Sequence, residues 1–329
     1  MKISIHVNIV ICLFSLFFSP ACSDDGHSTA NNNADASVGA NTIPRYVLVV
    51  HNEPNPADIP EFYHKLEELI NKANDYHMKL TLMFTPPWVD FLLENNERAS
   101  NISKWKSEGH EISVHHHGPS LNYWDGYSPL LEDEALADRR ECCKHKASLD
   151  NISIEEACAT GNSYNGTMED YMKKMQKLDP DIKSGCMNEE MEKLFLPNAI
   201  IHPTCSGFAN FGQAGRELSD SLTEKGINEF ISVGTVNGIK RKWLAHSTMI
   251  RDTTSDDRAI DLFPTLDTNT IFGAVTHSID GQSIQLLHFM EYLHTVDPTG
   301  EKSMTVSEAI ESKILPLKDI DSFLEESSL

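Results

Sequence analysis

Residues 109–119 read Gly-His-Glu-Ile-Ser-Val-His-His-His-Gly-Pro, a short apolar run that ends in three consecutive histidines. Side chains alternate between the two faces of a strand, so an extended run places His115 and His117 on one face and His116 on the other. Neutral imidazole is the commonest metal-ligating side chain in proteins. The stretch therefore predicts a strand that ends in a chelating histidine pair; the alternative is a solvated histidine patch on a loop.

The chain before this stretch alternates between strand-like and helix-like segments. Residues 45–50 and 80–85 are apolar runs of strand length, and the polar and apolar residues of 58–77 predict an amphipathic helix. A further helix is predicted over residues 88–107. Because an all-apolar strand fits a sheet that is covered on both faces, this order predicts an α/β fold with parallel strands.

Polar side chains follow the first and the third of these strands. Alternation places His51 and Glu53 on one side of the first strand, as it pairs His115 with His117 on the third. In parallel α/β folds the active site lies at the carboxyl ends of the strands. The sequence therefore offers two candidate ligand pairs at one edge of the sheet.

The same residues resemble a known family. Gly109-His110-Glu111-Ile112-x-x-His115 is similar to the second motif of the polysaccharide deacetylase (NodB-homology) family, Gly-His-Glu-Ile-Gly-Asn-His. The segment His51-Asn52-Glu53-Pro54-Asn55 stands where that family has Asp-Asp-Gly-Pro-Asn, and residues 80–84 resemble the strand between the two motifs. The resemblance covers residues 46–119. It implies a distorted (β/α) barrel for residues 44–329, the catalytic domain.

The chain departs from the family at the residues that carry the chemistry. The two family aspartates, which serve as catalytic base and metal ligand, are replaced by His51 and Asn52, and Pro119 stands in place of the usual second histidine. His51-x-Glu53-Pro54 with His115-x-His117 looks like a variant of the Asp-x-Glu-Pro and His-x-His patterns of some divergent members. It implies a divalent metal, Zn²⁺ by preference, with the ligands His51, Glu53, His115 and His117.

A second catalytic candidate follows a later strand. Residues 271–278 form an apolar run that ends near His277, which stands for the family histidine that protonates the departing amine. His288 copies the letters Leu-x-His of that motif better, but it lies in a helix predicted over residues 283–295. The alternative for His277 is a hydrogen-bonded residue at a strand end.

Other histidines receive different predictions. His202 resembles the family arginine that orients the catalytic base. Residues 261–265 are expected to form a short strand and turn. The remaining histidines are expected to be surface or structural residues: His64, His77, His145, His246 and His294.

The first 43 residues differ in kind from the rest. Residues 1–22 combine Lys2, an apolar run and small residues, which predicts a secretory signal peptide. Pro-Ala-Cys22 resembles a bacterial lipoprotein cleavage site, with Ser19 where leucine is usual. Residues 23–43 are polar and predict a flexible linker. We therefore expect an exported protein, in the cell envelope or secreted, whose only membrane contact is a lipid on Cys22.

Residues 120–197 leave the resemblance and predict a helical insertion that contains cysteines. An exported protein meets an oxidising compartment, which favours disulfides, but the pairing cannot be read from the spacing. The cysteines beyond residue 22 are Cys142, Cys143, Cys158, Cys186 and Cys205. Three aromatic residues at the start of the insertion suit either stacking on a sugar ring or loop packing: Tyr123, Trp124 and Tyr127.

Charge limits the partners. With 27 Lys and Arg against 49 Asp and Glu, the net charge of −22 argues against binding to nucleic acid or to anionic membranes. A carbohydrate substrate is what the family resemblance implies, although no residue pattern names the sugar.

These observations predict a metal-dependent hydrolase that removes acetyl groups from a carbohydrate through a metal-bound water. Glu53 is either a ligand or the general base, and His277 is the general acid. One alternative is an anchored, non-catalytic carbohydrate-binding protein, which the missing aspartate pair favours. Another is a glycosidase on the same barrel, in which Glu53 pairs with a second carboxylate. The candidates for that second group are Asp125, Asp252 and Asp261.

Overall fold

The computed structural model describes residues 43–322, except 54, 56, 122, 160, 162, 188–195, 205–225, 247 and 280. The predicted signal peptide with Cys22, the predicted linker up to residue 42 and Cys205 lie outside the described residues. In the part of the chain that is described, no helix is both long enough and apolar enough to cross a membrane.

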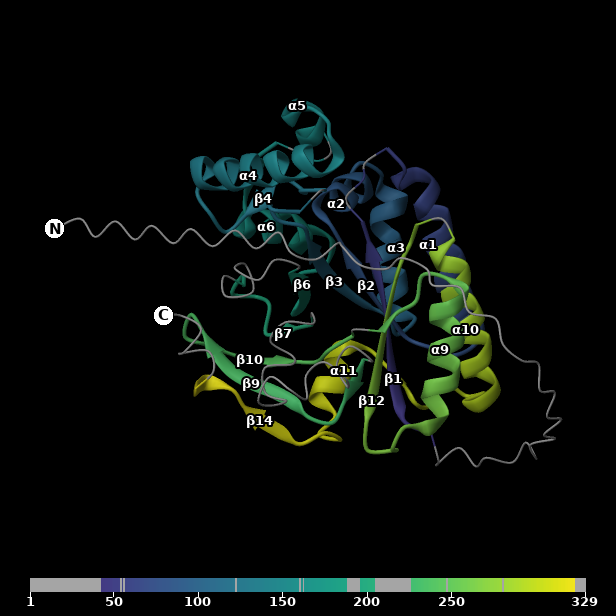
Figure 1. Cartoon of the computed structure of the whole chain (residues 1–329). Helices are drawn as coiled ribbons and strands as arrows, with labels where there is room; N and C mark the ends of the chain where they lie inside the picture. The colour runs from purple at the N-terminus through teal and green to yellow at the C-terminus, as the bar shows by residue number, and fades with distance from the viewer. Residues whose placement is uncertain are drawn as a thin grey trace, which may run out of the picture.

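A curled parallel sheet forms the centre of the fold (Figure 1). Its strand order is β11-β12-β1-β2-β3-β6-β7, an open path rather than a closed ring. The strands are β1 (Arg45–Asn52), β2 (Leu80–Phe84), β3 (Glu111–His116), β6 (Ser184–Met187), β7 (His202–Pro203), β11 (Thr248–Met249) and β12 (Ile271–His277). Two short strands extend it: β8 (Ile227–Asn228) is antiparallel to β12, and β13 (Ser303–Met304) is parallel to β1. The predicted α/β fold, a distorted (β/α) barrel, is confirmed.

Helices cover the convex side of this sheet (Figure 1). They are α1 (Ile59–Asp75), α2 (Pro86–Leu93), α3 (Asn96–Ser107), α6 (Met168–Leu178), α9 (Thr253–Leu262) and α10 (Gln282–Val296). Their buried residues form one apolar cluster with the outward side chains of the strands, such as Leu48 and Val50 of β1. The helices predicted over residues 58–77 and 283–295 are confirmed.

Two local predictions on this side were wrong. The helix predicted over residues 88–107 is two helices, because the Asn95 side chain accepts hydrogen bonds from the Glu97 and Arg98 amides and starts α3 anew. The strand predicted at residues 261–265 is instead the end of α9 and a 3-10 turn, η3 (Phe263–Thr265). Phe263 is fully buried there against other aromatic rings, which explains the apolar signal.

The concave side is filled by protein. A second sheet of order β10-β9-β14 lies there, with β9 (Ile231–Val236), β10 (Ile239–Trp243) and β14 (Leu317–Asp319), together with helix α11 (Val306–Glu311). Val47 and Val49 of β1 pack against residues of this layer, such as Ile231 and Val306. As far as the chain is described, the inside of the barrel is therefore a packed core.

Residues 120–197 contain a helical excursion and also part of the barrel. The excursion holds β4 (Tyr127–Ser128), α4 (Glu132–Asp150), α5 (Ile154–Cys158) and β5 (Gly166–Thr167), and it lies at the top of Figure 1. Helix α6 and strand β6, which follow within the same range, belong to the barrel, since β6 pairs with β3.

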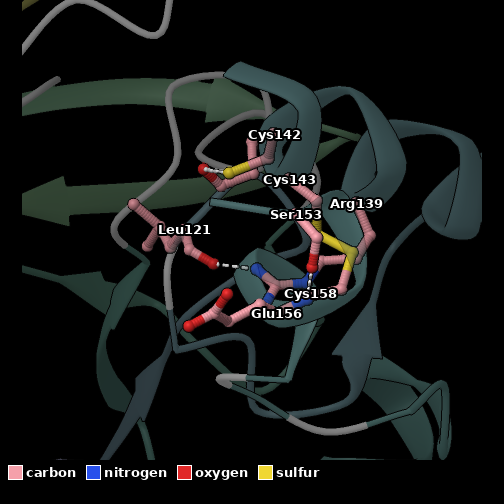
Figure 2. The surroundings of a disulfide bond; sticks show 8 residues. Leu121, Arg139, Cys142, Cys143, Ser153, Glu156 and Cys158 are labelled. Atoms are coloured by element: carbon pink, nitrogen blue, oxygen red, sulfur yellow. Dashed lines mark hydrogen bonds between the residues drawn. A yellow bond between two sulfur atoms is a disulfide. The ribbon is translucent and has the colours of Figure 1, made fainter. Parts of the chain in front are cut away.

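A disulfide joins the two helices of the excursion (Figure 2). Cys143 and Cys158 are bonded, and around them lies a small apolar cluster separate from the main core. Arg139 of α4 donates to the Leu121 carbonyl, and the Cys142 thiol donates to the Ser120 carbonyl, which ties α4 to the chain that follows β3. Cys186 is also disulfide-bonded, to a partner outside the described residues. The prediction of disulfides is thus confirmed.

Removing this disulfide should loosen the excursion without unfolding the barrel. The bond closes a loop with a sequence separation of 15, for which the lost loop entropy corresponds to about 3 kcal/mol. In a Cys143→Ser/Cys158→Ser variant, we expect the α5 amides to exchange hydrogen faster by a factor that corresponds to this energy, while the amides of β1 keep their protection. Equal acceleration in β1 would contradict the separate stability of the excursion.

At the amino end of β3, two residues of the motif hold neighbouring elements. His110 Nδ1 accepts from the Leu80 amide at 3.0 Å, and its Nε2 lies 3.0 Å from Asn74 Oδ1. Glu111 accepts from the Ser184 hydroxyl at 2.7 Å and from the Ser307 amide at 3.0 Å. These two residues fix the register of the sheet and lie at the opposite end of β3 from the three histidines.

His110 should make the metal-free protein sensitive to acid. Burial lowers the pKa of His110 to about 4 from its usual 6.5. Between these values the unfolded chain binds a proton that the folded chain does not, so stability falls as the pH falls. Between pH 7 and pH 4.5 the free energy of unfolding should fall in both proteins, but by about 2 kcal/mol less in a His110→Asn variant than in the parent. Both proteins are measured by urea unfolding at the two pH values, with a chelator present. An equal loss in the two proteins would contradict this role.

Candidate metal centre

The inward-facing side chains of three strands converge at their carboxyl ends. On β1, Val47 and Val49 point to the inner layer, so alternation continues this row to His51 and then Glu53. The same rule continues β3 to His115 and His117, and β12 to His277. His51 and His277 are direct partners in the β1–β12 register, as His115 and Cys186 are in β3–β6. The strand pairing thus brings the two predicted ligand pairs together.

Glu53 is the centre of this cluster. Its Oε2 lies 3.1 Å from His117 Nε2, and its Oε1 lies 3.1 Å from His277 Nε2 and 3.5 Å from His115 Nε2. The Glu53 carbonyl accepts from the Trp88 indole at 2.9 Å, which holds the backbone of this residue against α2. One partly buried carboxylate therefore faces three imidazoles from two other strands.

His115 and His117, which the sequence predicts to be a chelating pair, lie next to each other. Their Nε2 atoms lie 3.0 Å apart. His115 Nδ1 lies 3.3 Å from the Cys186 carbonyl, which can only accept, so this nitrogen carries the proton and Nε2 carries the lone pair. His116 points to the other side, where its Nδ1 lies 2.8 Å from Asp125 Oδ2.

Asp125 supports this pair from behind. The same Oδ2 accepts from the His117 amide at 2.9 Å, and Oδ1 accepts from the Tyr127 amide at 3.0 Å. The sequence pointed to Asp125 only as a carboxylate of a glycosidase. Its place beside His116 depends on the turn that follows β3, which no spacing rule predicts.

His246 is a member of the cluster that the sequence missed. It was expected to be a surface or structural residue, but it is buried, and its Nε2 lies 3.1 Å from His51 Nε2. Its Nδ1 lies 2.6 Å from the Thr204 hydroxyl. His246 comes from the connection between β10 and β11, a segment without the strand-end pattern that identified the other histidines.

Burial keeps several of these imidazoles neutral. It lowers the pKa of His115 and holds that of His51 well below the usual range, and it lowers the pKa of His246 to about 3. Burial alone would raise the pKa of Glu53, but its interactions with the histidines, first of all the charge of His117, outweigh this effect and hold that pKa well below its usual range. In turn, Glu53 overcomes the effect of burial on His117 and raises its pKa. Neutral imidazole and ionised carboxylate are the forms that bind metals.

The donor set fits a divalent cation. Glu53, His115 and His117 offer ligand atoms that all lie within 4.8 Å of one another, and so do His51, Glu53 and His277. With the His115 Nδ1 proton on a carbonyl, a nitrogen lone pair and a carboxylate oxygen face each other across 3.5 Å. Two lone pairs that face each other in a buried space repel, and a cation bound between them stabilises the arrangement.

The structure places His277 in the cluster and His288 outside it. His277 Nδ1 lies 2.8 Å from Gln282 Oε1, and its Nε2 faces Glu53. Each ring nitrogen of His277 thus has an oxygen atom within hydrogen-bond distance. His288 lies on α10, where it contacts Asp256 at 2.9 Å.

The prediction for His202 was wrong. Its Nδ1 lies 2.9 Å from the Ser307 hydroxyl, at the amino end of β3 where Ser307 also binds Glu111. Residue 202 pairs with Ser184 at the start of β6, so the register places it at the far end of the strands from Glu53. It is Thr204, two residues later, that reaches the cluster through His246.

A cavity of about 300 Å³ shares Asp125 with the support of the histidine pair. It lies between the first turns of α1 and α2 and the excursion, and Phe91, Tyr127 and Asn165 are among its lining residues. Of the three aromatic candidates, Trp124 is buried and donates to the Tyr127 carbonyl, which makes it a packing residue. Tyr123 is about half exposed at 48%.

No family model matches the chain, and no curated protein matches it. Solved structures with a similar arrangement include a 4-alpha-glucanotransferase from Thermococcus litoralis, 14% identical with a TM-score of 0.49. The match covers 84% of this chain but only 42% of the glucanotransferase.

Deacetylases also occur among these structures. A protein from Mycobacterium smegmatis described as a polysaccharide deacetylase is 8% identical with a TM-score of 0.45, over 84% of this chain and 94% of its own. A peptidoglycan deacetylase from Bacillus subtilis is 13% identical with a TM-score of 0.39, over 85% and 95%. Likenesses at these values do not decide the activity, for which the geometry of the histidine cluster is the relevant observation.

Proposed function

We propose that this chain is an exported, metal-dependent hydrolase that removes acetyl groups from a carbohydrate, with residues 44–329 as its catalytic domain. The observation that carries the proposal is the partly buried carboxylate of Glu53, which faces a histidine pair on one strand and a third histidine on another. This is a set of groups that can bind a cation and also move a proton.

The proposed ligands of the cation are His51, Glu53, His115 and His117. Nitrogen-rich sites suit Zn²⁺, whereas Mg²⁺ and Ca²⁺ prefer oxygen ligands. When bound, such a cation polarises an acyl oxygen and lowers the pKa of water towards ~7. Asp125 keeps the pair in place, since it accepts from the backbone of His117.

Two residues handle protons in this proposal. Glu53 takes the proton of the attacking water, as its ionised form requires. His277 lies 3.1 Å from Glu53 Oε1 and, as an imidazolium, gives a proton to the leaving nitrogen or oxygen of the sugar. The two groups are close enough to exchange the proton between successive turnovers.

Two further features support export. The described part of the chain contains the Cys143–Cys158 disulfide, which is typical of proteins from oxidising compartments, and the first 22 residues have the composition of a signal peptide. The cavity beside Asp125 is lined by none of the clustered histidines, so the carbohydrate part of the proposal rests on the family resemblance.

The geometry favours this proposal over a glycosidase. A glycosidase needs a second carboxylate ~5–9.5 Å from the first. Among the described residues, the close groups of potential ligands that include Glu53 contain only histidines besides it. Asp125 has both oxygens engaged, and Asp252 caps α9.

Acetate release tests the proposal. The purified protein, supplied with Zn²⁺, is incubated with N-acetylated and O-acetylated oligosaccharides, and acetate is measured with and without a chelator. We expect release that the chelator abolishes and added Zn²⁺ restores, and that a His115→Ala/His117→Ala variant lacks. A His64→Ala variant, changed at an exposed helix position, should behave as the parent. Binding of the oligosaccharide without any release would support the anchored binding protein instead.

A further inference from the structure

The cluster contains the same arrangement of two imidazoles twice. The Nε2 atoms of His115 and His117 lie 3.0 Å apart, with ring planes at 84°. The Nε2 atoms of His51 and His246 lie 3.1 Å apart, with ring planes at 83°. Two ligands of one tetrahedral zinc, at bond lengths of ~2.0–2.1 Å, are separated by about 3.3 Å. Each pair therefore has the spacing of two ligands of a single ion.

The two pairs lie side by side. The rings of His51 and His115 stack, with centroids 4.0 Å apart and planes at 26°. Rings from different pairs are thus roughly parallel, whereas the two rings within each pair are nearly perpendicular. Two-metal sites in hydrolases hold their ions ~3.5–4 Å apart. The stacking places the two pairs next to each other, as a two-metal site requires.

The cluster has more donors than one ion uses. A catalytic zinc takes three protein ligands and leaves one position open. Glu53, His115 and His117 already form such a set, and His51 and His246 remain. Cys186 lies close to this second pair, but its sulfur is in a disulfide and cannot act as a thiolate, so solvent would complete the second position.

The fold holds His246 in place with several contacts. The Asn228 side chain donates to the Ala245 carbonyl at 2.8 Å and accepts from the Ala245 amide at 2.8 Å, which fixes the backbone just before His246. Gly273 of β12 permits the approach, because a Cβ there would lie 2.3 Å from the Ala245 oxygen. Thr204 then orients the ring through Nδ1. Three separate segments therefore hold His246 in place, which is more than its packing requires.

We propose that the cluster binds two divalent cations: one between Glu53, His115 and His117, and a second at the pair His51 and His246. The inference rests on the proposed function for the first position. It moves His51 from that position to a second one and adds His246 and a second cation there, with Thr204 as a positioning residue for His246.

Metal stoichiometry tests the inference. The purified full-length protein is saturated with Zn²⁺, freed of loosely bound ions by gel filtration and analysed by elemental mass spectrometry. We expect two ions per chain in the parent and in the His64→Ala control, and one in His246→Gln. Should His246→Gln fail to fold, Thr204→Val keeps the imidazole and should still weaken the second ion by about 10–100-fold, the usual effect of losing a partner of a ligand.

A spectroscopic measurement separates a pair of ions from two distant ones. With Mn²⁺ in place of Zn²⁺, we expect an exchange-coupled paramagnetic resonance signal in the parent and an isolated-ion signal in His246→Gln. One ion per chain in the parent, or uncoupled ions, would overturn the two-cation inference and leave the proposed function intact. No bound ion at all would overturn both.

Discussion

Replacing Glu53 by glutamine is expected to lower acetate release by about 10²–10⁴-fold, the usual contribution of a general base. Glutamine keeps the size and one oxygen of the side chain but removes the negative charge that faces His117 and His277. The variant should also retain less Zn²⁺ after gel filtration, because it lacks the carboxylate that, among the described residues, lies in a close group of potential ligands with His115.

The control for this variant is Glu301→Gln, which changes an exposed carboxylate in a surface turn. It should release acetate at the rate of the parent and hold the same amount of Zn²⁺. If Glu53→Gln keeps more than a tenth of the parental rate, Glu53 is neither the base nor a required ligand, and the assignment of this residue fails.

Replacing His277 by glutamine is expected to lower kcat by about 10²–10⁴-fold while the metal content stays unchanged. The reason is that His277 contacts Glu53 and Gln282, an arrangement that suits a proton donor, whereas the ligand pairs lie elsewhere in the cluster. A general acid matters only when the leaving group needs a proton. The loss should therefore be large for an N-acetylated sugar and small for 4-nitrophenyl acetate, whose leaving group departs without one.

His288→Gln is the matched control, since His288 has the same side chain but lies on the outer helix α10 beside Asp256. It should leave both substrates unaffected. Equal losses on the two substrates in His277→Gln, or a loss of bound Zn²⁺, would contradict a general acid and make His277 a ligand.

The strand-end residues of the site could be predicted because they follow from a local rule. Alternation along β1 and β3 decides on which face His51, Glu53, His115 and His117 lie, and parallel pairing brings the strand ends together. The apolar runs themselves identify the strands, since each is buried on both faces. The rule needs no knowledge of distant contacts, and it also accounts for the place of His277 at the end of β12.

Residues that depend on distant contacts could not be predicted in this way. His246 reaches the cluster only because Asn228 and Gly273 hold its segment against β12. His202 copies a family position, yet the β6–β7 register shifts it to the opposite end of the strands. The inner layer of β9, β10 and α11 also left no strand-end signal, since its apolar residues read as ordinary core. In each case the deciding contact joins segments far apart in the sequence.

The measurement that tests the central claim most directly is the metal content of the purified protein by elemental mass spectrometry, beside a His115→Ala/His117→Ala variant. The account predicts at least one zinc-like ion per chain in the parent and its loss from the variant. A parent that holds no metal, even after incubation with Zn²⁺, would contradict the hydrolase, and an envelope-anchored carbohydrate-binding protein would then be the better explanation of the fold.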